Sequence, residues 1–189
     1  DGKWIRECLI AGEGKKIVQS DLSGIESRTS DHYTFFINPD RIKKTQMPFF
    51  DPHTEISVSS GLMTTDEEVF FVYKSALKDD PSLNVENFSE LYQPTDEVRR
   101  LLALPEDEQN KLLKTLKNAR TKGKTTNYSS LYLVGSETLG RALEISKKEA
   151  QKLIDSYWSI HFAVKEATKE LIIKKYSLIY SKFISNLTI

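Results

Sequence analysis

The chain has 189 residues, of which 39% are hydrophobic and 29% charged, and its formal net charge is zero. These values are typical of a globular domain, and the sequence contains no run of about 18 apolar residues, so a membrane-spanning helix is not expected. The single cysteine, Cys8, excludes an intramolecular disulfide and a multi-cysteine zinc site, and with no signal-peptide pattern in view it favours a cytoplasmic location.

The first predicted element is a β-strand over residues 15–21, a β-prone run that follows the turn-like Gly12-Glu13-Gly14. Helices are then expected over residues 25–33 and from about residue 53 to residue 60. A strand at the N-terminus followed by a mainly helical chain predicts an α+β fold.

The remaining predicted elements are helices. Thr65-Asp66-Glu67-Glu68 has the form of a capping box and predicts a helix that continues to about Ala76. Residues 79–105 contain three prolines and read as a looped, partly helical insertion, and residues 106–133 read as one or two helices. A second capping box begins at Ser146 and predicts a long helix to about Lys175.

Basic residues recur through residues 111–124, a segment with no acidic residue. Arg120, Lys124, Tyr128 and Tyr132 follow at intervals of four, so on an α-helix they share one slowly turning face, since four residues advance by about 400°. Two cations and then two aromatic rings suit a nucleoside triphosphate, whose phosphates need positive charge and whose base needs a flat apolar surface. We call these four residues the ladder.

The alternative for the ladder is a solvated basic helix face beside two core tyrosines. Two details count against this alternative. Neither Arg120 nor Lys124 has a carboxylate four residues away on the same helix. Gly123 also costs about 1 kcal/mol relative to Ala inside a helix, which favours a position that a ligand or a strand approaches closely.

Asp21 lies at the expected end of the predicted strand. A carboxylate on a rigid element can hold Mg²⁺, which takes its other ligands from water and substrate phosphates. Glu26 follows at the start of the next helix, where an acidic residue also stabilises the helix dipole.

Three segments, in this order along the chain, carry a family resemblance. Residues 21–28 match D-x-S-x-I-E-x-R, Asp51-Pro52-His53-Thr54-Glu55 is similar to D-I-H-T-x, and the ladder matches R-x3-K-x3-[FY]-x3-Y. Together they resemble motif A, the intervening segment and the fingers helix of family A (DNA polymerase I-like) DNA polymerases, most of all the phage-encoded members. The family usually has Gly directly after the last Tyr, where this chain has Leu133.

The resemblance implies a role for each matching residue. The implied metal ligands are the side chain of Asp21 and the backbone carbonyl of Leu22. Glu26 would act as a steric gate against the ribose 2′-hydroxyl, and Tyr132 would contact the nascent base pair or the template. The residues implied to bind the dNTP are Glu26, His53, Arg120, Lys124 and Tyr128.

The resemblance also implies an organisation and an activity. Residues 1–60 would form part of a palm with antiparallel strands, and residues 61–189 a helical fingers subdomain with the insertion at about 79–105. The activity would be template-directed addition of dNTPs to a primer 3′-hydroxyl by a two-metal Mg²⁺ mechanism, in a bacterial or phage-infected cell. The implied partners are primer-template DNA, dNTPs and the rest of the polymerase, because the second metal-binding Asp of the family's H-D-E segment and the thumb are not found in this chain.

Two other functions remain open. The chain could be a non-catalytic module that binds nucleotide or DNA, because the second carboxylate is missing. It could also be an RNA-synthesising relative, which would incorporate ribonucleotides with Glu26 unchanged.

Overall fold

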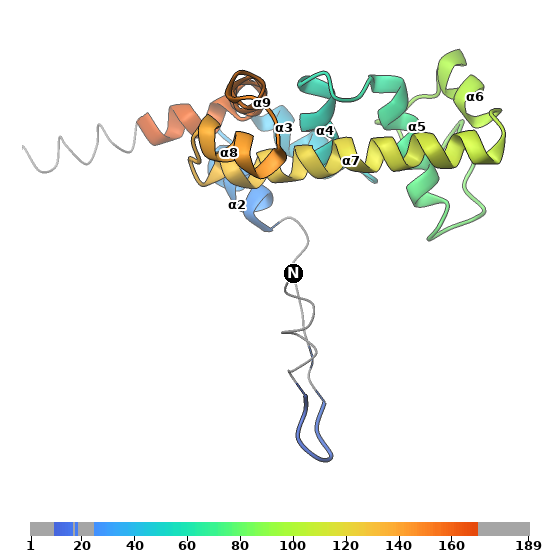
Figure 1. Ribbon diagram of the computed structural model, residues 1–189, viewed down its shortest axis with the longest axis horizontal. Helices are drawn as coiled ribbons and strands as arrows, with labels where there is room; N and C mark the ends of the chain where they lie inside the picture. The colour runs from blue at the N-terminus through green and yellow to red at the C-terminus, as the bar shows by residue number, and fades with distance from the viewer. Residues whose placement is uncertain (1–9, 17, 19–24, 170–189) are drawn as a thin grey trace, which may run out of the picture.

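The computed structural model describes residues 10–16, 18 and 25–169. Helices form all the regular structure in these ranges, and none of them is long and apolar enough to cross a membrane. With the labels of Figure 1, they are α2 (Ile25–Tyr33), α3 (Pro39–Thr45), α4 (Pro52–Ser59), α5 (Thr65–Ala76), α6 (Asp96–Leu102), α7 (Glu106–Leu131), α8 (Ser136–Leu143) and α9 (Lys147–Ile160).

The expected α+β class with antiparallel palm strands is therefore wrong for the described part of the chain. Lys15, Lys16 and Val18 fall within the predicted strand and are not in a strand. A strand is stable only when its backbone groups pair with another strand, and the described residues supply no partner. The β-prone composition of this run therefore did not suffice to place Lys15, Lys16 and Val18 in a strand.

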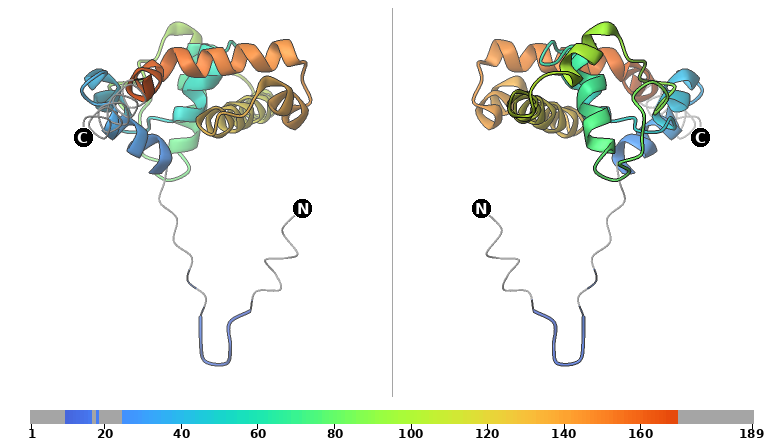
Figure 2. Two further views of the ribbon diagram at one scale, coloured as in Figure 1. Left: turned by 90° about the vertical axis from the view of Figure 1, so that its left-hand side faces the viewer. Right: turned by 90° about the vertical axis from the view of Figure 1, so that its right-hand side faces the viewer.

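Helix α7 is the axis on which the other helices are arranged. In Figure 1 it runs along the length of the molecule, with α5 and α6 near its N-terminal end, α4 beside its middle and α8 and α9 near its C-terminal end. Figure 2, which looks along α7, shows α9 running crosswise to it. One long helix thus links the segment after the insertion to the C-terminal helices.

The helix ends follow from local capping chemistry. The box predicted at the start of α5 is present but one residue earlier, with Thr64 accepting from the backbone N–H of Glu67 and Glu67 bonding back to the Thr64 N–H. The box predicted between Ser146 and Glu149 is confirmed at the start of α9. This helix ends at Ile160, and residues 162–169 are again helical, so the predicted continuous helix is interrupted at residue 161.

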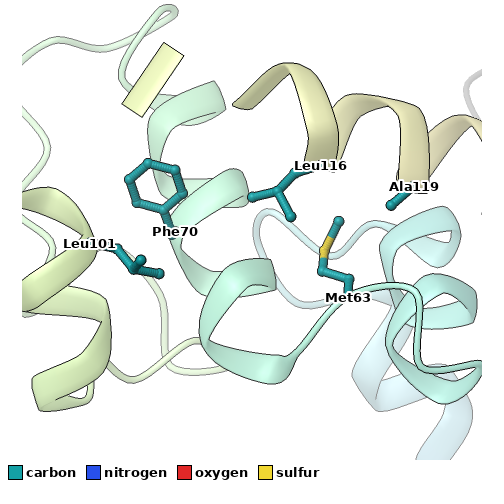
Figure 3. Close-up of a cluster of buried hydrophobic side chains, with 5 residues drawn as sticks. All are labelled: Met63, Phe70, Leu101, Leu116 and Ala119. Carbon is teal, nitrogen blue, oxygen red and sulfur yellow. The ribbon is translucent and has the colours of Figure 1, made fainter. Parts of the chain in front are cut away.

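A hydrophobic core joins α5, α6 and α7. Figure 3 shows its five buried side chains, which are Met63, Phe70, Leu101, Leu116 and Ala119. A second buried cluster packs the insertion, which contains α6, against α5 through Phe88 and Tyr92, whose rings are stacked with centroids 6.2 Å apart. The insertion is therefore packed onto α5, as its apolar residues require for burial.

Candidate nucleotide-binding site

Helix α4 lies against α7 at Gly123, and this contact requires glycine. A Cβ added to Gly123 would lie 2.2 Å from the carbonyl oxygen of His53 and 2.4 Å from the hydroxyl of Ser57. The cost of a glycine inside α7 is thus explained by the close approach of another helix backbone. The sequence indicated a close approach at this position by a ligand or a strand, and the approaching element is instead the helix α4.

The hydroxyl of Ser57 ties the two helices together. Its single proton is shared between two carbonyl oxygens, that of Ala119 on α7 and that of His53 in its own helix, each 2.9 Å from the Ser57 oxygen, and Ser57 is completely buried. A buried hydroxyl needs such a partner, because leaving it unbonded costs about 1–3 kcal/mol. The register of α4 along α7 is therefore set by a hydrogen bond as well as by the glycine.

This register places Asp51 and His53 beside the first two residues of the ladder. Asp51 is the N-cap of α4: its Oδ1 accepts from the backbone N–H of His53 at 3.0 Å. Its Oδ2 accepts from the Nε of Arg120 in an ion pair. Arg120 therefore has a carboxylate partner after all, but on another helix, where spacing within α7 could not reveal it.

His53 lies between the cations and the ring of Tyr128. The side-chain amide of Asn127 donates to Nδ1 of His53 at 3.3 Å, and the His53 and Tyr128 ring centroids are 5.7 Å apart. Because Nδ1 accepts, the neutral ring carries its proton on Nε2, where it can donate to an anion. Burial lowers the pKa of His53. The positive charges of Arg120 and Lys124 lower it further, whereas the negative charge of Asp51 raises it.

Lys124 and Tyr128 form the next step of the ladder. The Lys124 ammonium lies 5.9 Å from the centroid of the Tyr128 ring, and Lys124 is exposed while Tyr128 is half-buried. A cation held over an aromatic face in this way is stabilised by the ring quadrupole. An anion that reached Lys124 would therefore lie next to a ring on which a base or sugar can rest.

The ladder ends at an exposed and strained turn. Tyr132 is the C-cap of α7 and is 69% exposed. Leu133 follows with a φ of 59°, in the left-handed region, and is 78% exposed. Leu133 stands where the polymerase family pattern has Gly, and its backbone adopts the left-handed conformation that favours Gly.

The predicted site residues fall into two groups. The structure brings His53, Arg120, Lys124 and Tyr128 together, with Tyr132 one turn further along α7. Glu26 lies in the first turn of α2, half-buried, and makes no hydrogen bond or ion pair with any described residue. Its expected position beside the nucleotide sugar stays a prediction.

Asp21 and Leu22, the expected metal ligands, lie outside the described residues. Within the described ranges, no three His, Cys, Asp or Glu side chains converge so as to hold a metal ion. The Mg²⁺ site stays a prediction that depends on Asp21 and on a carboxylate from elsewhere.

Sequence reasoning missed the supporting residues of the site. Asp51 and Asn127 position the Arg120 and His53 side chains, and Ser57 joins the helices. Only Asp51 had a readable signal, since Asp followed by Pro is typical of an N-cap and first helical position. The other two act across the contact between α4 and α7, and no local pattern encodes such a contact.

Comparisons of the chain with protein-family models, with curated proteins and with solved structures found no match.

Proposed function

We propose that this chain is the fingers-bearing part of a DNA-directed DNA polymerase of the DNA polymerase I-like family. The observation that carries the proposal is the joint placement of His53, Arg120, Lys124 and Tyr128 at the α4–α7 contact. These residues come from two of the three resembling segments, which the ion pair between Asp51 and Arg120 joins across 69 positions of the chain.

The chemistry of these groups suits an incoming dNTP. Arg120 and Lys124 would neutralise the triphosphate, Nε2–H of His53 would donate to a phosphate oxygen, and the Tyr128 ring would support the sugar and base. Asp51 would hold the Arg120 guanidinium in place before the phosphates compete for it. Positioning and charge neutralisation are the main protein contributions to phosphoryl and nucleotidyl transfer.

The reaction itself would be attack of a primer 3′-hydroxyl on the α-phosphorus of the dNTP, with pyrophosphate as the leaving group. Mg²⁺, when bound by Asp21 and the Leu22 carbonyl, would neutralise charge at the reacting phosphate. The second carboxylate and the thumb would come from the rest of the polymerase, in the same or another polypeptide. Primer-template DNA would be the other substrate.

A direct binding test uses the whole chain and a fluorescent dTTP analogue. Lys124→Gln should weaken binding about 10- to 100-fold, because charge-assisted hydrogen bonds contribute about 1.5–3 kcal/mol. Lys148→Gln on α9 is the matched control, since Lys148 is an exposed lysine outside the site, and it should bind as the original chain does. Equal affinities of the Lys124 variant and the original chain would refute the ladder's role.

A primer-extension assay separates the polymerase from a non-catalytic binding module. The chain is combined with a polypeptide that carries the H-D-E segment, and dNTP or rNTP is supplied. The original chain should extend the primer with dNTP. The Asp21→Ala variant should not extend it but should still bind dTTP. Binding without extension would instead assign a non-catalytic module, and efficient rNTP incorporation an RNA-synthesising relative.

A further inference from the structure

A pocket of about 570 Å³ adjoins the ladder and lies between the C-terminal half of α5 and the N-terminal half of α7. Its lining includes the apolar side chains of Phe71, Val72 and Leu113, which are partly or fully buried. Arg120 and Asp51 mark the end at which it meets the ladder. The volume is within the range of pockets that take small ligands or one unit of a polymer.

Four lysines, from α5, the turn that follows it and α7, converge on this pocket. They are Lys74, Lys78, Lys114 and Lys117. None of them forms an ion pair with any described residue. Of the two acidic residues in the lining, Asp51 is already paired with Arg120, so Asp79 alone faces four unneutralised cations.

The fold explains two of these lysines and leaves the other two unexplained. Lys74 lies in the last turn of α5 and Lys78 two residues beyond its end, where the helix dipole favours cations. Lys114 and Lys117 lie inside α7, three residues apart, where like charges repel each other. Lys111, one turn earlier, is by contrast paired with Asp107 at 3.7 Å. An anion in the pocket would remove the repulsion.

Phe49 adds an aromatic surface to the same pocket. Its ring is 40% exposed and lies 5.6 Å from the ring of Phe88, which anchors it from one side. Its backbone has a φ of 66°, a conformation that costs a residue with a Cβ about 1–2 kcal/mol. Such strain is concentrated at ligand-binding positions, where the surrounding structure holds it.

We propose that this pocket binds single-stranded nucleic acid, with a base against Phe49 and phosphates on Lys114 and Lys117. Basic grooves with exposed aromatic rings are how proteins bind single strands without reading sequence. Cations spread over two helices suit the successive phosphates of a strand better than the single phosphate of a free nucleotide. Arg120 lines this pocket and also belongs to the proposed dNTP site, but the inference does not rest on the proposed polymerase function, because the residues that carry it, Phe49, Lys114 and Lys117, are not among those proposed to bind the dNTP.

The test measures fluorescence anisotropy of a short fluorescein-labelled oligodeoxythymidine with the whole chain. Lys114→Gln with Lys117→Gln should weaken binding at least about tenfold at low salt. The same double variant should also reduce the slope of log affinity against log salt by about 1.4, since each phosphate contact on a single strand contributes about 0.7. Phe49→Gly, which removes the ring and suits the backbone, should weaken binding by about fivefold or more.

The matched control is Lys148→Gln with Lys152→Gln, two exposed lysines on α9 whose loss removes the same charge elsewhere. Gln keeps the helix propensity of Lys, so folding is retained in both double variants. If the pocket variants bind the oligodeoxythymidine as strongly as the control variant does, the proposal is overturned. Competition by dTMP at equal nucleotide concentration would assign the pocket to free nucleotides instead, and equal competition by poly-glutamate would assign it to acidic polymers in general.

The two proposals fail independently. The pocket variants should leave binding of the dTTP analogue unchanged, and Lys124→Gln should leave binding of the oligodeoxythymidine unchanged. Loss of both ligands in the lysine variants would indicate unfolding, which far-ultraviolet circular dichroism detects directly, and Phe49→Gly then serves as the remaining test because it alters no charge.

Discussion

Gly123→Ala is the substitution that most directly tests how the candidate site is held. The added Cβ would lie 2.2 Å from the carbonyl oxygen of His53 and 2.4 Å from the hydroxyl of Ser57. An ordinary contact at that atom is about 3.4 Å or longer, so α4 would have to move by about 1.2 Å, the difference between 3.4 Å and 2.2 Å. Since the closest atom is backbone, no side-chain rotation can relieve the clash.

The expected free-energy change combines three contributions. Overpacking of this kind costs about 1–3 kcal/mol. Displacement of α4 would also break the hydrogen bond from Ser57 to Ala119, which contributes about 1 kcal/mol. Ala gains about 1 kcal/mol over Gly in helix propensity. The net expectation is a loss of about 1–3 kcal/mol in the free energy of unfolding, whereas an exposed helical glycine changed to Ala would give a gain.

The assay is urea denaturation followed by circular dichroism, together with binding of the dTTP analogue. Gly123→Ala should lower the urea midpoint and weaken nucleotide binding, because His53 moves away from Lys124 and Tyr128. Combining it with Ser57→Ala should recover part of the loss, since one of the two clashing atoms is then absent. A Gly123→Ala chain that is more stable and binds equally well would show that the α4–α7 contact is not as described.

Three further predictions concern stability. Leu133→Gly should raise the free energy of unfolding by about 1 kcal/mol, because Leu133 has a φ of 59° that Gly adopts without strain; a fall in urea midpoint would contradict this. Arg41→Ala should cost about 3–5 kcal/mol by urea denaturation, because Arg41 is only 7% exposed and its loss leaves the buried Asp31 without an ion-pair partner among the described residues, while Glu55 keeps Lys44; a loss below about 1 kcal/mol would show these pairs to be unimportant. Burial and the charge of Arg41 lower the pKa of His161 from 6.5 to about 4, and Glu55 opposes them. Between pH 6.5 and pH 4 the unfolded chain therefore protonates this histidine while the folded chain does not, so the free energy of unfolding falls as the pH drops, by about 3 kcal/mol at most. His161→Phe keeps a ring that can stack on Tyr157, as the His161 ring does with centroids 4.4 Å apart. This variant should flatten the pH dependence of the urea midpoint between pH 6.5 and pH 4, and an unchanged slope would contradict the role given to His161.

The helices of this chain were largely predictable, and the reason is that their signals are local. The predicted helix over residues 25–33 is confirmed as α2, and the capping box at Ser146 is confirmed as the start of α9. Caps and periodic apolar positions act within one or two turns, so they can be read from neighbouring residues. The strand over residues 15–21 was wrong in its described part, because a strand depends on a partner that local sequence does not reveal.

The candidate site shows the same division. The spacing of Arg120, Lys124 and Tyr128 was enough to place them on one face of a helix, since that follows from helix geometry alone. Gly123 showed that something approaches α7 closely, because a glycine inside a helix is costly.

Only tertiary packing decided that α4 is the approaching element, that Asp51 pairs with Arg120, and that Asn127 orients His53. The four lysines of the α5–α7 pocket likewise meet only because two helices separated by the insertion pack together. Contacts between distant segments depend on how whole helices fit, and that fit is a property of the folded chain rather than of any short stretch of it.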